Sequence, residues 1–303
     1  MSKFSTCPGT LSDSYTVFNI FERSLADLAR RFGSTSSFSA DDPRALERMW
    51  AERRSLYEHL ALTADQFWLA EREGTAIGYA RSIVRDGVRQ LTELFVLPGE
   101  QSGGIGRTLM AHAFPPIKNA KYNSIITSPD IPAQVLYLKS GGYPRFPAYY
   151  FGHSPEQLSF SSDLTIAPFQ ASPSNLATLA GIDNTVLGFT RQVDHNWFLS
   201  ERQGYLYCRN DQPVGYGYLG VRNGPFALLD EADFPAVLAH AESQTLKQGR
   251  KEFGLEVPMI NQVAVDYLLG RGFRMDAFMA VMMTDKPFAR FENYILTSPP
   301  FFM

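Results

Sequence analysis

The spacing of apolar positions changes along the N-terminal region. Residues 15–22 (YTVFNIFE) alternate and are rich in aromatic and β-branched side chains, which predicts an opening strand. Residues 25–32 predict a short helix. A longer helix is expected over residues 43–62, because a proline in the first turn follows Asp41 or Asp42 as its N-cap.

Three strand-like segments follow the predicted helix, at residues 67–72, 75–84 and 88–97. Between them stand Glu73-Gly74 and Asp86-Gly87, which are typical of two-residue hairpin turns. The pattern therefore predicts an antiparallel meander.

The remainder of the first half predicts alternating helices and strands. After the glycine-rich residues 98–106 we expect, in order, a helix, a strand, a helix and a strand at residues 107–114, 121–127, 132–139 and 145–151. This order predicts an α/β fold with a mixed, mostly antiparallel sheet flanked by helices, and it does not fit regular βαβ winding.

Part of the first half recurs in the second half. At a constant offset of 137, Gly78-Tyr79 matches Gly215-Tyr216 within two longer similar segments. A second match pairs residues 134–146 with residues 264–276. Two matches in the same order indicate two copies of one fold, with chance similarity of two amphipathic hairpins as the alternative.

The polar, serine-rich residues 154–163 predict a linker between these copies. We therefore expect a first domain at residues 1–153 and a second at residues 164–303. The last six residues, 298–303 (SPPFFM), are apolar and are expected to pack onto the second domain.

Composition supports two ordinary globular domains. The chain has 303 residues, of which 45% are hydrophobic and 19% charged, which excludes a disordered, collagen-like or coiled-coil protein. The net charge of −3 gives no electrostatic support for a nucleic-acid partner. Residues 1–150 carry +2 and residues 151–303 carry −5, so a polyanionic ligand would prefer the first half.

The two cysteines, Cys7 and Cys208, lie far apart and suggest neither a disulfide framework nor a metal site. The N-terminus has no apolar run typical of a signal peptide, and no apolar stretch of about 18 residues predicts a membrane helix. A cytoplasmic protein without a membrane partner is expected; the sequence does not indicate an oligomeric state.

The pattern Gln101-x-x-Gly104-x-Gly106 lies between an apolar strand and a helix. Glycines allow backbone N–H groups to turn toward a phosphate, and the positive end of the next helix dipole faces the same ligand. Arg107 adds a positive charge. The sequence thus predicts an anion-binding loop, with a surface loop ended by a glycine cap as the alternative.

Two familiar phosphate motifs do not fit this loop. A P-loop requires Lys-Ser or Lys-Thr after its last glycine, and neither pair is present. A dinucleotide-binding motif requires a third glycine at residue 109, where this chain has leucine.

The arrangement Leu-Phe-Val-Leu-Pro-x-x-Gln-x-x-Gly-x-Gly instead resembles the acyl-CoA loop of the GNAT superfamily of N-acyltransferases. Leu136-Tyr137-x-x-x-Gly-Gly-Tyr143 resembles a later helix of the same family. The resemblance is clearest over residues 67–146. It implies two tandem GNAT-like domains, with acetyl-CoA as the acyl donor of the first.

The resemblance also implies which residues contact the cofactor. The pantetheine arm would bond to the backbone of Phe95, Val96 and Leu97. The pyrophosphate would lie on the N–H groups of the loop and the first helical turn: Gln101, Ser102, Gly103, Gly104, Ile105, Gly106, Arg107 and Thr108.

Two residues are implied for catalysis. Glu93 is the candidate base or water-positioning group, with a solvated Glu on the sheet face as the alternative. Tyr137 matches the tyrosine that commonly protonates the leaving sulfur, with an ordinary core tyrosine as the alternative. One departure is that Asp130 and Pro132 occupy the stretch where the family often has an asparagine.

The second half resembles the same family but lacks the loop. The positions that correspond to the loop, 235–243, contain no glycine, so we expect a degenerate domain that does not bind acyl-CoA. Tyr267 corresponds to Tyr137. Asp183, Asp194 and His195 could line a substrate cleft, although surface-loop positions are the favoured interpretation.

The leading hypothesis is an N-acetyltransferase that transfers the acetyl group of acetyl-CoA to the amine of a small molecule by direct attack. One alternative is a non-catalytic acyl-CoA sensor or scaffold, and another is a nucleotide site at the glycine-rich loop.

Overall fold

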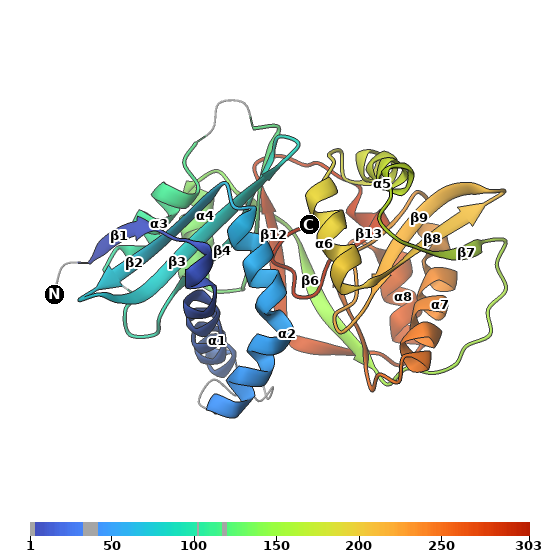
Figure 1. Cartoon of the computed structure of the whole chain (residues 1–303), viewed down its shortest axis with the longest axis horizontal. Helices are drawn as coiled ribbons and strands as arrows, with labels where there is room; N and C mark the ends of the chain where they lie inside the picture. The colour runs from blue at the N-terminus through green and yellow to red at the C-terminus, as the bar shows by residue number, and fades with distance from the viewer. Residues whose placement is uncertain (1–3, 33–41, 102, 117–119) are drawn as a thin grey trace. The chain divides into compact units, whose positions relative to one another are not determined.

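The computed structural model describes residues 4–32, 42–101, 103–116 and 120–303 (Figure 1). Contacts between Cα atoms divide the chain into two compact units. Unit 1 comprises Met1–Ile126 and Asp130–Gly142, and unit 2 comprises Thr127–Pro129 and Tyr143–Met303. No helix of the described ranges is both long and apolar enough to cross a membrane.

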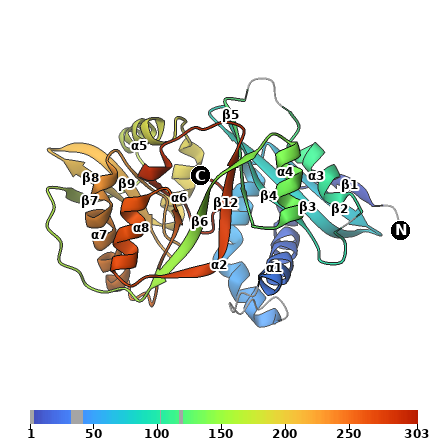
Figure 2. The same cartoon turned by 180° about the vertical axis from the view of Figure 1, so that it is seen from behind.

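Unit 1 is a sheet covered by helices on both faces. Its elements are β1 (Ser5–Pro8), α1 (Ser14–Arg31), α2 (Pro43–Leu62), β2 (Gln66–Arg72), β3 (Thr75–Arg85), β4 (Val88–Val96), α3 (Ile105–Ala113), β5 (Tyr122–Thr127) and α4 (Ile131–Lys139). The strands lie in the order β1-β2-β3-β4-β5, and only β4 and β5 are parallel. Helices α1 and α2 cover one face, and α3 and α4 cover the other (Figures 1 and 2).

Unit 2 contains two sheets. Its elements are β6 (Tyr143–His153), β7 (Thr165–Phe169), α5 (Pro173–Val186), α6 (Gln192–Glu201), β8 (Gln203–Arg209), β9 (Gln212–Leu219), β10 (Phe226–Leu228), α7 (Phe234–Lys247), β11 (Phe253–Pro258), α8 (Gln262–Gly270), β12 (Arg274–Thr284) and β13 (Tyr294–Ile295). One sheet has the order β13-β10-β9-β8-β7, and in the other β6 lies between β12 and β11.

The elements from β7 to β12 repeat the order of those from β1 to β6. A Cβ atom at Gly78 would lie 2.9 Å from the carbonyl oxygen of Phe95, and one at Gly215 would lie 2.9 Å from that of Ala227. Glycine is therefore needed at both positions for the same close approach, which aligns β3 with β9 and β4 with β10. Among the described elements β13 has no counterpart in the first copy.

Strand β6 follows the first copy in sequence but belongs to unit 2. It pairs along its length with β11 and with β12, because both neighbours present antiparallel edges to it. Unit 2 thus includes β6 from Tyr143 onward, whereas the sequence pattern predicts a first domain that extends to residue 153.

The strand predicted over residues 15–22 is wrong, because these residues form the first half of α1. The apolar positions also fit one face of a helix, since Val17, Phe18 and Phe21 are buried whereas Tyr15 is exposed. The ring of Phe18 meets that of Tyr57 on α2 at 5.6 Å. Aromatic and β-branched residues favour burial more than they favour a strand, and here a helix supplies that burial.

Other local predictions are confirmed. Helix α2 begins at Pro43, and the side chain of Asp42 accepts the N–H of Arg44 at 3.0 Å; Asp41 lies outside the described residues. Both predicted hairpin turns have positive φ at their two central residues, as a type I′ turn requires. The apolar tail is also buried, with Phe302 stacked on Phe198 at 5.8 Å.

Unit 2 contains a buried charged cluster that includes Asp183 of α5 and His195 of α6. Asp183 accepts hydrogen bonds from Arg191 Nε at 3.0 Å, from Tyr216 Oη, and shares one with His195 Nε2 at 2.8 Å. The other ring nitrogen of His195 bonds to Tyr218 Oη at 2.7 Å. The surface-loop interpretation of Asp183 and His195 is therefore wrong, because both side chains are fully enclosed.

Burial alone would raise the pKa of Asp183, but the charges and hydrogen bonds of Arg191 and His195 outweigh it and lower the pKa to about 2. The ionised carboxylate therefore stabilises the fold above its ordinary pKa of 3.8. This stabilisation is lost as the pH falls through the window from 3.8 to about 2.

We predict that Asp183→Asn lowers the free energy of unfolding by about 3–5 kcal/mol at pH 7, since it leaves the buried Arg191 without its counter-ion. Urea unfolding at pH 7, 5 and 3 measures this, and the difference from the wild type should narrow at pH 3. Asp211→Asn, at an exposed turn position with positive φ, is the matched control. A difference that is the same at all three pH values would contradict the assignment.

Candidate functional site

The candidate site begins where β4 leaves its neighbour β5. The two strands pair only from Val88↔Tyr122 to Leu91↔Ile125, whereas β4 pairs with β3 as far as Val96. At the same point Thr92 forms a bulge, since Glu93 pairs with Arg81 and Leu91 with Ser82. A bulge increases the local twist of a strand, so the second half of β4 has a free edge toward β5 within unit 1.

The glycine-rich loop follows this free edge and leads into α3. Gly104 is the N-cap of α3, with φ of 81°, and no side chain of the described residues caps the helix. A side chain at Gly104 would have a strained backbone, although no atom lies within 4 Å of its Cβ position. The first N–H groups of a helix have no partner inside it, so this N-terminus can accept an anion.

The charges around the loop favour an anion. Glu100 is ion-paired with Arg72, so its carboxylate is neutralised, and the side chain of Arg107 is exposed at the first turn. Gly103 is exposed, with open space around its Cβ position, and Ile105 anchors the turn in the core. Ser102 lies outside the described residues.

The backbone atoms predicted for pantetheine are partly engaged. Gln101 Nε2 donates to the Val96 carbonyl at 3.2 Å, and Ser24 Oγ donates to it at 3.4 Å. Leu97 donates its N–H to Ile77 at 2.9 Å, and its carbonyl accepts the N–H of Glu100 at 3.0 Å. A pantetheine arm would therefore have to displace the Gln101 side chain to reach Val96.

Helices α3 and α4 come together above this edge. A Cβ atom at Gly106 would lie 3.7 Å from a methyl group of Leu94 on β4 and 4.0 Å from one of Leu136 on α4. These are ordinary van der Waals distances, so the three elements lie close together at this position. The next residue of α4, Tyr137, is 4% exposed and is the buried residue of this helix.

Asp130 stands where the family often has an asparagine. Its carboxylate caps α4 by accepting the N–H of Ala133 at 3.4 Å, and it is ion-paired with Arg31 on α1 at 2.9 Å. Pro132 occupies the first turn of α4, where its missing N–H costs no hydrogen bond. The departure thus has a local structural role.

Glu93 lies on the face of the sheet that α1 and α2 cover, and both of its oxygens are engaged. Arg81 approaches Oε2 with Nε at 2.7 Å and Nη2 at 2.5 Å, and Tyr79 Oη donates to Oε1 at 2.7 Å. Arg81 also donates to the carbonyl of Tyr57 at 3.0 Å. Both charged side chains have no exposed surface, so the solvated interpretation of Glu93 is wrong.

Burial, and then the charge of Glu93, raise the pKa of Tyr79 well above its usual range. The hydroxyl of Tyr79 therefore stays protonated and donates to the carboxylate. Sequence reasoning missed Tyr79 and Arg81. The available signal was an arginine inside an apolar strand, which needs an acidic partner when it is buried.

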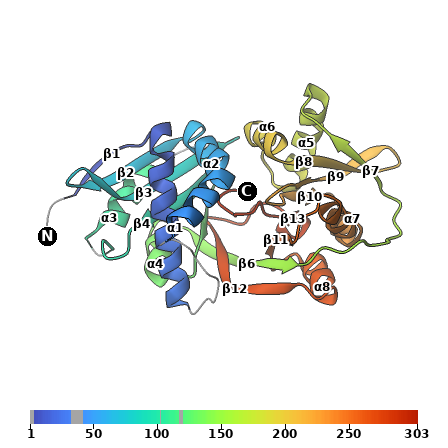
Figure 3. The same ribbon diagram turned by 60° about the horizontal axis from the view of Figure 1, so that its bottom comes forward.

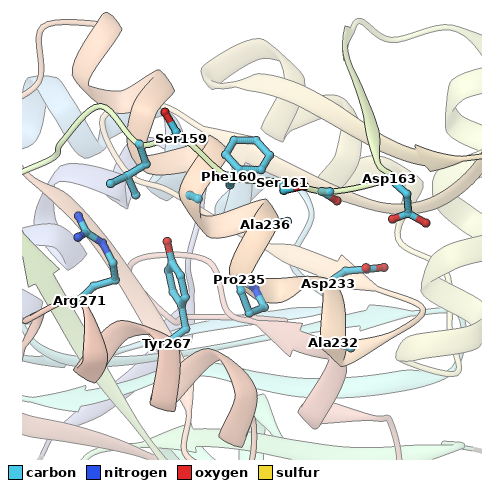
Figure 4. A pocket seen from close by; sticks show the side chains of 13 residues that line it. Ser159, Phe160, Ser161, Asp163, Ala232, Asp233, Pro235, Ala236, Tyr267 and Arg271 are labelled. Carbon is cyan, nitrogen blue, oxygen red and sulfur yellow. The ribbon is translucent and has the colours of Figure 1, made fainter.

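Unit 2 contains a separate hollow of about 550 Å³ (Figure 4). It is lined by residues 158–163 of the predicted linker, by the start of α7, and by Tyr267 and Arg271. Tyr267 is the counterpart of Tyr137, so the repeat places this hollow at the position that corresponds to the candidate site in unit 1. No group of three or more His, Cys, Asp or Glu side chains in the described residues is placed to hold a metal ion.

Comparison with protein families gives one match. The family model of the acetyltransferase (GNAT) domain matches residues 63–141, which include β4, the glycine-rich loop, α3 and α4. Comparison with curated proteins gives no match.

Solved structures extend the similarity over nearly the whole chain. A putative acetyltransferase from Pyrococcus horikoshii has a TM-score of 0.70 at 14% identity, over 97% of this chain and 94% of that chain. A tandem GNAT protein from the clavulanic acid biosynthesis pathway has a TM-score of 0.55 at 15% identity, with coverages of 94% and 99%. A GCN5-related N-acetyltransferase from Sphaerobacter thermophilus has a TM-score of 0.58 at 14% identity, with coverages of 94% and 96%.

Identities this low show the fold alone, whereas the family model matches the sequence of the first domain itself. The two findings agree with the free edge of β4 and the uncapped start of α3. Residues 63–141 therefore match the acetyltransferase (GNAT) domain, and the chain as a whole has the fold of GNAT proteins, tandem ones included.

Proposed function

We propose that the protein is an N-acetyltransferase that uses acetyl-CoA and acts on the amine of a small molecule. The observation that carries this proposal is the junction of a half-paired strand with an uncapped helix. The backbone beyond Leu91 on β4 offers an extended edge to an amide-containing arm, and α3 offers N–H groups to a pyrophosphate. An acyl-CoA has both chemical features, in that order.

In the proposed reaction the amine nitrogen attacks the thioester carbonyl carbon directly. The C–S bond breaks, the acetyl group stays on nitrogen, and CoA leaves as a thiolate. The amine must lose one proton and the thiolate must gain one, so a base and an acid are both useful. In this proposal Tyr137 supplies the proton to sulfur.

Glu93 is the proposed base or water-positioning group, and its hydrogen bonds set a condition on that role. Both oxygens accept from Arg81 and Tyr79, so a proton can be taken up only if one of these donors releases an oxygen. Tyr79 is the weaker of the two partners because it is neutral, and it is the donor that we expect to move.

The engaged carboxylate also supports a second candidate, a non-catalytic acyl-CoA sensor. In that case the pair of Arg81 and Glu93 would only hold β3 and β4 together beside the cofactor. A sensor would bind CoA without transferring the acetyl group to any member of a broad amine panel.

We predict that Gly104→Glu weakens acetyl-CoA binding at least about tenfold, or about 1.4 kcal/mol, since a carboxylate would face the pyrophosphate from a strained backbone. Isothermal titration calorimetry measures the affinity. Gly249→Glu is the matched control, because Gly249 also has positive φ and open space but lies after α7. Undiminished binding by Gly104→Glu would contradict the site.

We further predict that Glu93→Gln and Tyr137→Phe each lower kcat by roughly 10²-fold while the affinity for CoA changes little. Steady-state assays with a panel of small amines, together with calorimetry, separate the two quantities. Thermal melts must accompany Glu93→Gln, because it also leaves Arg81 without its charged partner. Full rates in both folded variants would remove both residues from the proposed chemistry.

A further inference from the structure

In the first copy, β4 separates from β5 and leaves a gap between the two strands. The repeat shows where the corresponding gap lies in the second copy. Gly78 pairs with Val96 and Gly215 pairs with Leu228, and each of the two glycines approaches the carbonyl of the residue before its partner. Residues 226–228 of β10 therefore correspond to residues 94–96, the part of β4 with a free edge. In unit 2 the matching gap lies between β10 and β11.

This second gap is filled by the chain itself. Strand β13 pairs with β10 through Phe226↔Ile295 and Ala227↔Tyr294. The next residue, Leu296, donates its N–H to the carbonyl of Glu256 on β11 at 3.0 Å. Figure 3 shows β13 between β10 and β11. The segment thus takes the backbone positions that the proposed function assigns to pantetheine in unit 1.

Side chains hold the segment in place from both ends. Asn293 Nδ2 donates to the carbonyl of Leu228 at 2.8 Å, and Asn261 Nδ2 donates to that of Tyr294 at 3.3 Å. Arg202 donates to Thr297 Oγ1 at 2.8 Å. Residues 293–298 are all buried, which is typical of a permanent part of the core.

The absence of a side chain at Gly224 leaves the space that this segment occupies. A Cβ atom at Gly224 would lie 2.3 Å from the carbonyl oxygen of Leu296, and its φ is +85°. No other residue type fits this position without a shift of the segment. The sequence of the second copy is therefore matched to the segment that fills its gap.

The linker also covers the groove between α7 and α8. In the first copy, the corresponding groove would hold the rest of a cofactor. The N–H of Glu156 donates to Glu242 Oε1 at 3.1 Å, and the N–H of Leu158 donates to Ser243 Oγ at 3.0 Å. The linker is fixed further by the ion pairs Arg271–Glu156 at 2.9 Å and Arg209–Asp163 at 2.6 Å. Residues 158–163 then pass over the hollow of Figure 4.

We propose that residues 293–298 are a built-in occupant of the second copy's cofactor gap, so that the chain binds a single acyl-CoA, in unit 1. This inference rests on the proposed function for the site in unit 1. The second copy is complete as a fold because the chain supplies the backbone partners that a cofactor would otherwise provide. The linker over α7 and α8 covers the remaining part of the same groove.

Native mass spectrometry of the full chain with CoA tests the number of sites. We expect one CoA per chain, and a lower occupancy of that one site in Gly104→Glu. Two CoA per chain, or one whose occupancy Gly104→Glu does not lower, would overturn the proposal. If no CoA binds to the wild type, the proposed function fails, and hydrogen exchange alone then decides this inference.

Hydrogen exchange is measured for peptides that cover residues 293–298, in the wild type and in Gly224→Ala. We expect slow exchange that CoA does not change, and exchange at least about tenfold faster in Gly224→Ala. Gly249→Ala is the matched control, because it has the same backbone strain with no atom within 4 Å. Fast exchange in the wild type would show that the segment is not stably paired with β10, and exchange that CoA accelerates would show that CoA displaces the segment. Either result would overturn the proposal.

Discussion

Every buried backbone N–H and C=O group needs a partner, and the two copies of this fold meet that requirement in different ways. In unit 1, β4 turns away from β5 after Leu91, and α3 begins at Gly104 without a side-chain cap. In unit 2, the corresponding strand β10 receives β13 as its neighbour. Within its own unit, the first copy therefore leaves this part of the strand edge without a neighbouring strand, whereas the second copy pairs the corresponding edge with β13.

A second common feature is a tyrosine that donates to a buried carboxylate paired with arginine. Tyr79 donates to Glu93, and Tyr216, at the equivalent position, donates to Asp183. In unit 1 the carboxylate comes from β4 itself, next to the free edge, whereas in unit 2 it comes from α5. Glu93 therefore lies on the strand that borders the open gap of unit 1, whereas β10, which borders the filled gap of unit 2, carries no charged residue. This difference agrees with the proposal that unit 1 alone is catalytic.

Local patterns in the sequence were sufficient for much of this picture. The hairpin turns depend on Asp-Gly and Glu-Gly pairs whose φ angles are set locally, and the start of α2 depends on Asp42 and Pro43. Gly104 marked the turn before α3 because its positive φ favours glycine. The repeat of Gly-Tyr at an offset of 137 located the second copy because a Cβ atom at Gly78 or Gly215 would lie too close to a backbone carbonyl.

The tertiary structure decided the features that depend on distant partners. Residues 15–22 form a helix because α2 and the sheet bury it, although their spacing fits either element. Strand β6 joins unit 2 because β11 and β12 offer it edges far away in sequence. Whether Glu93 is free or paired depends on Arg81 across the sheet, and whether a gap is open depends on β13, which begins at residue 294. The sequence by itself thus determined turns, caps and the repeat, because these depend on neighbouring residues. Only the tertiary structure determined which strand edges and charges were left for a ligand, because that depends on what the rest of the chain has already paired.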